Sequence, residues 1–106
     1  MNRKLILTAA LVLSLGVAHT ASATQITITQ KAKKFDIKKV TLKAGDSIKF
    51  VNADSITHNI YSRKGLKFDL GAQKPGTSST KVFDKAGKFK VRCAIHPKMK
   101  VIVSVN

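Results

Sequence analysis

Several residue types are scarce in this chain, and each scarcity excludes a class of protein. A single cysteine, Cys93, is present among 106 residues, so no internal disulfide can form. The Cys-x-x-Cys-His motif that attaches haem covalently is therefore also absent. Tryptophan is missing, and one tyrosine and five phenylalanines make up the aromatic residues. Because these six aromatic residues are few and form no basic–aromatic stacking pattern, no nucleic-acid partner is expected.

Acidic residues are scarce as well. Five aspartates and no glutamate oppose 20 Lys and Arg residues, which gives a formal net charge of +15. A positive field of this size attracts acidic partners and accelerates their association. It also keeps a small domain soluble, so the charge by itself does not identify a partner.

The N-terminus has the pattern of a secretory signal peptide. Arg3 and Lys4 precede an apolar run over residues 5–17, and Ala21-Ser22-Ala23 supplies an A-x-A cleavage site. The run is shorter than the roughly 20 residues of a membrane-spanning helix. We therefore expect a cleaved signal peptide at 1–23, a single domain at 24–106, a periplasmic location and no stable membrane span. An uncleaved anchor is the alternative.

After residue 24 the hydrophobic pattern has a period of two, which indicates strands. Turn residues separate the short runs, and the spacing is typical of an all-β sandwich or barrel of about seven to eight strands. Residues 62–79 are expected to be mostly loop, with room for a short helix between residues 65 and 75. The predicted strands are 25–30, 40–42, 47–52, 56–61, 80–83, 88–93 and 101–105.

The soft metal ligands of the domain form one small set. Without the signal peptide the chain keeps one cysteine, two histidines and one methionine, and three of these lie in the C-x2-H-x2-M run Cys93-Ala-Ile-His96-Pro-Lys-Met99. Cys93 shares a strand face with apolar residues, and His58 lies between Ile56 and Ile60 on another strand face. Both side chains should therefore point inward. Taken singly, each residue has an ordinary structural role, but their coincidence predicts a metal site.

The donor types favour copper. One thiolate, two imidazoles and a weak axial thioether are the ligands of type 1 copper, whereas structural zinc sites use four Cys or His ligands. A catalytic Cys–His pair would need an orienting third group, for which Asn59 is the nearby candidate. The sequence therefore predicts one type 1 copper ion held by His58, Cys93, His96 and Met99.

The chain also resembles the plastocyanin and amicyanin branch of the cupredoxins. The matching stretches are 44–54, His58-Asn59 and 83–99, and the short ligand loop is more similar to that of amicyanin. His58-Asn-Ile-Tyr-Ser and Phe68-Asp-Leu-Gly71 also resemble small methylamine-utilisation-type cupredoxins. The resemblance implies a Greek-key β-sandwich and gives Cys93 and the two histidines as equatorial ligands, with Met99 axial. It further implies that the Asn59 N–H donates to the Cys93 sulfur, that the Asn59 side chain ties the two ligand loops together, and that His96 is the electron port.

The expected function is a monomeric carrier of single electrons rather than an enzyme. The expected partner is an acidic redox protein, such as a c-type cytochrome or a dehydrogenase. Two alternatives use the same residues. One is a periplasmic copper carrier or chaperone without a redox shuttle role, and the other is a binding module whose metal is structural.

Overall fold

The computed structural model describes residues 22–106, and all regular elements in this part of the chain are strands. The predicted signal peptide, apart from its last two residues, lies outside the described residues. Over 22–106, no helix has the length and apolar character needed to cross a membrane. The strands are β1 (Gln25–Lys31), β2 (Lys34–Phe35), β3 (Lys39–Leu42), β4 (Asp46–Asn52), β5 (His58–Ser62), β6 (Phe68–Gln73), β7 (Ser78–Phe83), β8 (Gly87–Arg92) and β9 (Lys100–Val105).

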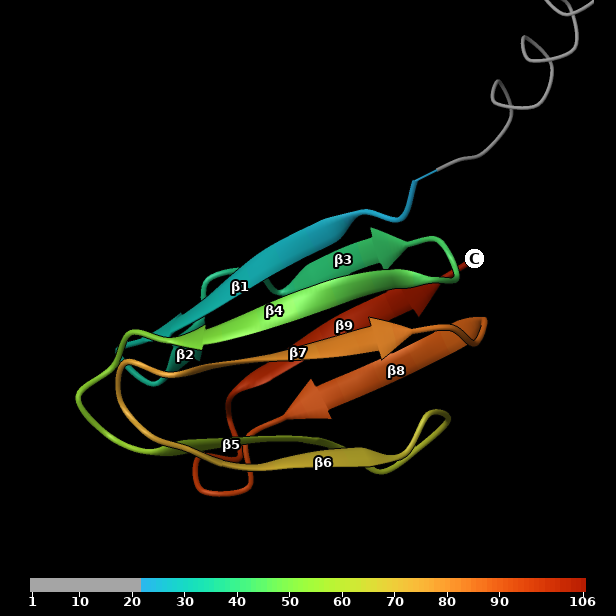
Figure 1. Cartoon of the computed structure of the whole chain (residues 1–106). Helices are drawn as coiled ribbons and strands as arrows, with labels where there is room; N and C mark the ends of the chain where they lie inside the picture. Colours follow the sequence, from blue (N-terminus) through green and yellow to red (C-terminus); the bar gives the residue numbers. More distant parts are fainter. Residues whose placement is uncertain (1–21) are drawn as a thin grey trace, which may run out of the picture.

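The strands form two sheets, as the all-β prediction requires. One sheet has the order β2-β1-β4-β7 and the other β3-β9-β8-β5-β6. β1 pairs with β4 and β3 pairs with β9 in parallel, while the other ladders are antiparallel. The β4–β5 and β8–β9 connections lie at one end of the sandwich, and the C-terminus lies at the other (Figure 1). Segments distant in sequence therefore meet at the first of these ends.

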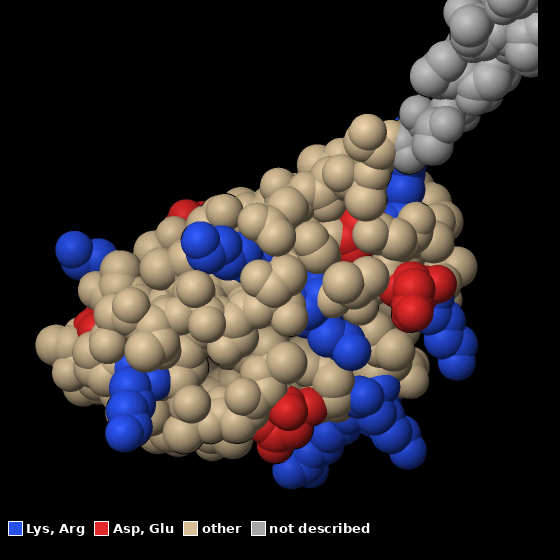
Figure 2. Space-filling view, viewed as in Figure 1, with Lys and Arg blue, Asp and Glu red and all other residues tan. Residues whose placement is uncertain are grey.

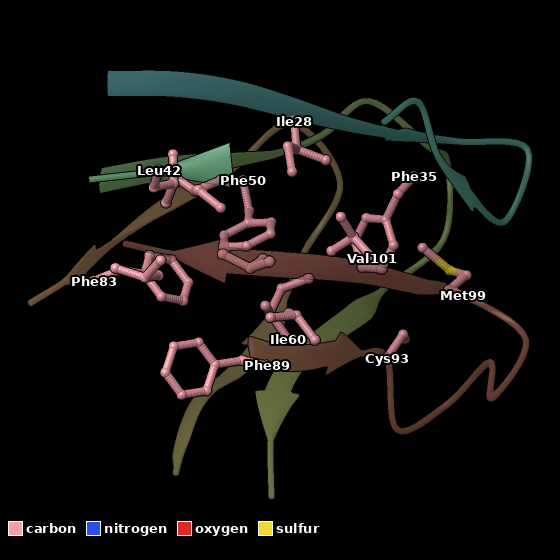
Figure 3. Packing of buried hydrophobic residues seen from close by; sticks show 14 residues of the cluster. Ile28, Phe35, Leu42, Phe50, Ile60, Phe83, Phe89, Cys93, Met99 and Val101 are labelled. Atoms are coloured by element: carbon pink, nitrogen blue, oxygen red, sulfur yellow. The ribbon is translucent and has the colours of Figure 1, made fainter. Parts of the chain in front are cut away.

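The core fills the space between the two sheets. Side chains alternate between buried and less buried along β4, β5 and β9, because successive residues of a strand face opposite sides. Four of the five phenylalanines are buried, and each large apolar side chain contributes roughly 1.5–3 kcal/mol when fully buried. Figure 3 shows Cys93 and Met99 at one end of this cluster. The core thus continues to the edge of the predicted metal site.

The structure differs from the sequence prediction between residues 62 and 79. A strand, β6, occupies 68–73, where a loop or short helix was expected. Gly71 adopts a φ of 78°, and the β5–β6 register shifts between Asn59 and Tyr61. Such an irregularity breaks the period-two pattern by which a strand is recognised. The two-residue β2 was also missed, so the strand count is nine.

Buried amides join the two sheets beside the metal site. Gln30 Nε2 donates to Gln73 Oε1 at 2.6 Å, and Gln73 Nε2 donates to the Phe50 carbonyl at 2.8 Å. Asn52 Nδ2 donates to the carbonyls of Gln73 and Ile56 at 2.8 and 2.9 Å. Since Gln73 belongs to one sheet and Gln30 and Asn52 to the other, these bonds fix the distance between the sheets. Asn52 also fixes the loop that follows it.

We predict that Asn52→Ala lowers the free energy of unfolding by roughly 2–4 kcal/mol, because it leaves buried carbonyls without a donor. Urea unfolding of the metal-free protein measures this. Ser78→Ala, at an exposed position on β7, is the control and should change stability by less than about 0.5 kcal/mol. Equal midpoints for Asn52→Ala and the parent protein would contradict a structural role for this network.

Candidate metal centre

The predicted ligands come together at one end of the sandwich. His58 is the first residue of β5, Cys93 directly follows β8, and Met99 directly precedes β9. The period-two prediction for the orientation of these strands is confirmed. His58 and Cys93 have no exposed side-chain surface, and Met99 is 2% exposed.

The backbone of the ligand loop is closed on itself. The Cys93 N–H donates to the Met99 carbonyl at 3.3 Å, and the Met99 N–H donates to the His96 carbonyl at 2.9 Å. These two bonds bring the ends of the seven-residue loop together. The loop therefore keeps Cys93, His96 and Met99 close together rather than along an extended chain.

Three donor atoms face one another at that point. His58 Nδ1 and His96 Nδ1 are 3.1 Å apart, and Cys93 Sγ lies 3.7 Å from His58 Nδ1 and 3.8 Å from His96 Nδ1. Among the described residues these three side chains form the cluster able to hold a metal ion. Two imidazole nitrogens this close need either a hydrogen on one of them, which is donated to the other, or a metal ion that both bind.

The spacing of the donors fits a metal ion. A point equidistant from the three atoms is about 2.1 Å from each, close to typical metal–imidazole distances of about 2.0–2.1 Å and metal–thiolate distances of about 2.3 Å. One thiolate, two imidazoles and a neighbouring thioether are the donors that copper prefers. The residues present therefore fit a type 1 copper ion.

Asp54 orients His58, a role that was not predicted from the sequence. Its Oδ2 lies 2.9 Å from His58 Nε2 and accepts the Lys33 backbone N–H at 2.9 Å. These two hydrogen bonds, of which the Lys33 bond has the larger effect, lower the pKa of Asp54 to about 2. An ionised carboxylate only accepts hydrogen bonds, so His58 Nε2 donates to it, and in the neutral imidazole Nδ1 then presents its lone pair to the cluster. A carboxylate four residues before the inward histidine was the available signal.

Asn59 contacts the cysteine through its backbone. Its N–H donates to Cys93 Sγ at 3.3 Å, which is the contact that the resemblance implies. The side chain behaves differently from the expectation, because Asn59 Nδ2 donates to Asp69 Oδ1 at 3.0 Å. It therefore connects β5 to β6 rather than to the ligand loop. This bond and the Gly71 N–H, which has the larger effect, lower the pKa of Asp69.

His96 lies at the surface end of the cluster. Its side chain is partly exposed, in contrast to the buried His58. The hollow around it is lined by Lys33, Ile95, Pro97 and Lys98. Apolar residues of its own loop therefore lie beside His96, but two lysines flank them.

Comparison with known proteins agrees with this fold and site. The family model described as a cupredoxin-like domain matches residues 4–103. The methylamine utilization protein MauL of Methylorubrum extorquens is 35% identical over 82 residues, covering 76% of this chain and 72% of that protein. Amicyanin-alpha of the same organism is 27% identical over 90 residues, covering 81% and 74%. The chain belongs to the cupredoxin family.

Solved structures support the same fold. A purple cupredoxin from Nitrosopumilus maritimus superposes with a TM-score of 0.70 at 22% identity, covering 76% of this chain and 99% of that one. A Cu(I) form of an amicyanin variant gives a TM-score of 0.72 at 20% identity, covering 84% and 87%. The Greek-key cupredoxin sandwich expected from the sequence is thus confirmed. Copper is the cofactor for which this donor arrangement is suited.

We predict that Asp54→Ala weakens copper binding about 10–100-fold, since the partner that orients His58 is removed. Asp54→Asn should lose less affinity because its amide oxygen can still accept from Nε2. Competition titration with a chelator measures both constants. Asp84→Asn removes the same charge from the β7–β8 turn and should leave the affinity unchanged. Unaltered affinity in Asp54→Ala would mean that the fold orients His58 without the carboxylate.

Proposed function

We propose that this protein carries single electrons between redox partners in the periplasm, using one type 1 copper ion. The observation that carries the proposal is the triangle of His58 Nδ1, Cys93 Sγ and His96 Nδ1, with sides of 3.1–3.8 Å. Its donor types match those of copper electron-transfer sites. His58, Cys93 and His96 would be the equatorial ligands, and Met99 the axial ligand.

The chain's own residues would keep the site rigid. When bound, copper supplies a one-electron Cu(II)/Cu(I) couple. Asp54 holds the His58 ring, and the Asn59 N–H donates to the thiolate sulfur, where it would stabilise the negative charge. We expect these contacts to be kept in both oxidation states, so little rearrangement would accompany electron transfer.

The two histidines would have different roles. His58 is fully buried and held by a carboxylate, so it would anchor the metal. His96 is partly exposed beside Ile95, which is 53% exposed. Of the two imidazoles, that of His96 is the one that a partner could approach, and it would serve as the path for electrons.

The location and partner are part of the proposal. The signal-peptide pattern at 1–23 supports export to the periplasm, and the positive charge favours an acidic redox protein, such as a c-type cytochrome or a dehydrogenase. Similarity to a methylamine utilization protein and to an amicyanin supports such a partner. The protein would act as a monomer and as a carrier rather than as an enzyme.

The first test is spectroscopic. After addition of Cu(II), the domain 24–106 should show an intense thiolate-to-copper band and narrow copper hyperfine splitting in EPR. Cys93→Ser should abolish both, because the thiolate is the source of the band. Met99→Leu is the matched control, since it keeps the thiolate and both imidazoles and should retain the intense band. A colourless parent protein that binds only Cu(I) would instead select the copper-carrier alternative.

The second test is electrochemical. The copper-loaded protein should give a reversible one-electron wave, and Met99→Leu should raise the reduction potential because an apolar group in the axial position favours Cu(I). Protein-film or solution voltammetry measures both. An irreversible wave, accompanied by transfer of copper to a metal-free acceptor, would contradict electron transfer as the function.

A further inference from the structure

A groove rich in lysine adjoins the metal centre. It has a volume of about 520 Å³ and runs along β2, the start of β3 and the start of β9, with Met99 among its lining residues. Four of its lysines come from the segment 33–39, and two come from the ligand loop and the start of β9. The lysine groove consists of Lys33, Lys34, Lys38, Lys39, Lys98 and Lys100.

The charges of the lysine groove are not neutralised within the described chain. All six lysines are exposed, and within 22–106 none of them lies in an ion pair with a carboxylate. Asp36 accepts the Thr29 N–H, and Asp54 accepts from His58 and the Lys33 backbone N–H, so neither carboxylate is paired with a lysine side chain of the groove. Because these positive charges lie close together without a neutralising partner, the groove has a positive potential that attracts an anionic surface. Figure 2 shows lysine and arginine side chains projecting from several places on one face of the domain.

A strained turn places one of these lysines at the metal centre. Ala32 and Lys33 join β1 to β2 with φ values of 53° and 57°. A two-residue hairpin with both φ angles positive favours asparagine and glycine, yet this turn has neither. The Asp54 carboxylate holds the Lys33 N–H at 2.9 Å. Lys33 thus occupies a backbone conformation in which glycine would be less strained, and this favours a functional role for the lysine side chain.

The lysine groove is continuous with the surface around His96. Lys33 and Lys98 line both the groove and the hollow that contains Ile95, His96 and Pro97. An apolar centre with a charged rim is the usual anatomy of a protein–protein interface. A single-stranded nucleic acid would instead stack its bases on exposed aromatic side chains, and Phe35, the aromatic residue of the groove, is only 4% exposed.

We propose that the lysine groove and the His96 hollow form one docking face for an acidic protein surface. Carboxylates of the partner would lie in the groove, while its electron-accepting or electron-donating site would cover Ile95 and His96. The proposal rests on the proposed electron-transfer function and adds where, and through which charges, the partner binds. Lys33 and Lys98, which line both the groove and the hollow, would attract the partner closest to the His96 imidazole.

Small redox reagents of opposite charge test the electrostatic part. Oxidation of the Cu(I) protein by hexacyanoferrate(III) should be fast at low salt and should fall on the order of 3–10-fold in the double variant Lys33→Gln, Lys98→Gln. Oxidation by the cationic tris(phenanthroline)cobalt(III) should instead become faster. The double variant Lys85→Gln, Lys88→Gln removes the same charge at the far end of the sandwich and should change either rate less than about twofold.

The outcomes separate this proposal from the function on which it rests. Equal losses in the two double variants would mean that only net charge matters, and would overturn the docking face. Failure of both reagents to oxidise the copper protein would instead overturn the electron-transfer function.

Binding can be measured without electron transfer. Poly-L-glutamate added to the diamagnetic Cu(I) protein should shift the amide NMR signals of residues 32–39 and 95–100. Equal or tighter binding of duplex DNA or phosphatidylglycerol vesicles at the same face would overturn the assignment to a protein partner. The variant Ala32→Asn, Lys33→Gly should raise the melting temperature yet weaken poly-L-glutamate binding. Unchanged binding in this more stable variant would contradict the role of Lys33.

Discussion

The structure at this end of the sandwich depends on holding three electron-pair donors, two imidazole nitrogens and a sulfur, within 3.8 Å of one another. Their lone pairs repel when no cation is shared between them, so the surrounding chain must oppose that repulsion. Asp54 fixes one ring, the Asn59 N–H fixes the sulfur, and two backbone hydrogen bonds close the ligand loop. The amides of Gln30, Gln73 and Asn52 then hold the sheets that carry these groups.

One carboxylate oxygen links the metal centre to the proposed docking face. Asp54 Oδ2 accepts from His58 Nε2 and from the Lys33 N–H. The same carboxylate oxygen therefore holds both the buried His58 ring and the turn that contains Lys33. Asp54 is held in turn, because its own N–H donates to Asn52 Oδ1 at 2.9 Å. The inter-sheet network, the orientation of His58 and the position of Lys33 therefore form one connected unit, and an exposed turn contributes to the geometry of a buried site.

Period and spacing were enough to predict much of this from the sequence. Alternation placed Cys93 and His58 on inward faces, and the C-x2-H-x2-M spacing brought three donors into one short loop. What was missed depends on tertiary contacts that leave no local pattern. Gln30 and Gln73 are 43 residues apart, and Asp54 acts through a loop shape that Asn52 imposes. β6 escaped recognition because Gly71 and the irregular pairing with β5 interrupt the alternation on which strand prediction relies.

The net charge could be counted from the sequence, but the positions of the lysines on the folded surface could not. Those positions determine where a charged partner is attracted. At about 0.1 M salt, exposed charges are screened over about 10 Å, whereas a six-residue strand spans about 20 Å. Lysines at the β7–β8 turn therefore contribute little to the field at His96, although they count equally in the total. The lysines of 33–39 and 98–100 are brought together only by the fold. For the proposed acidic partner, attraction would consequently be strongest near the partly exposed His96 imidazole.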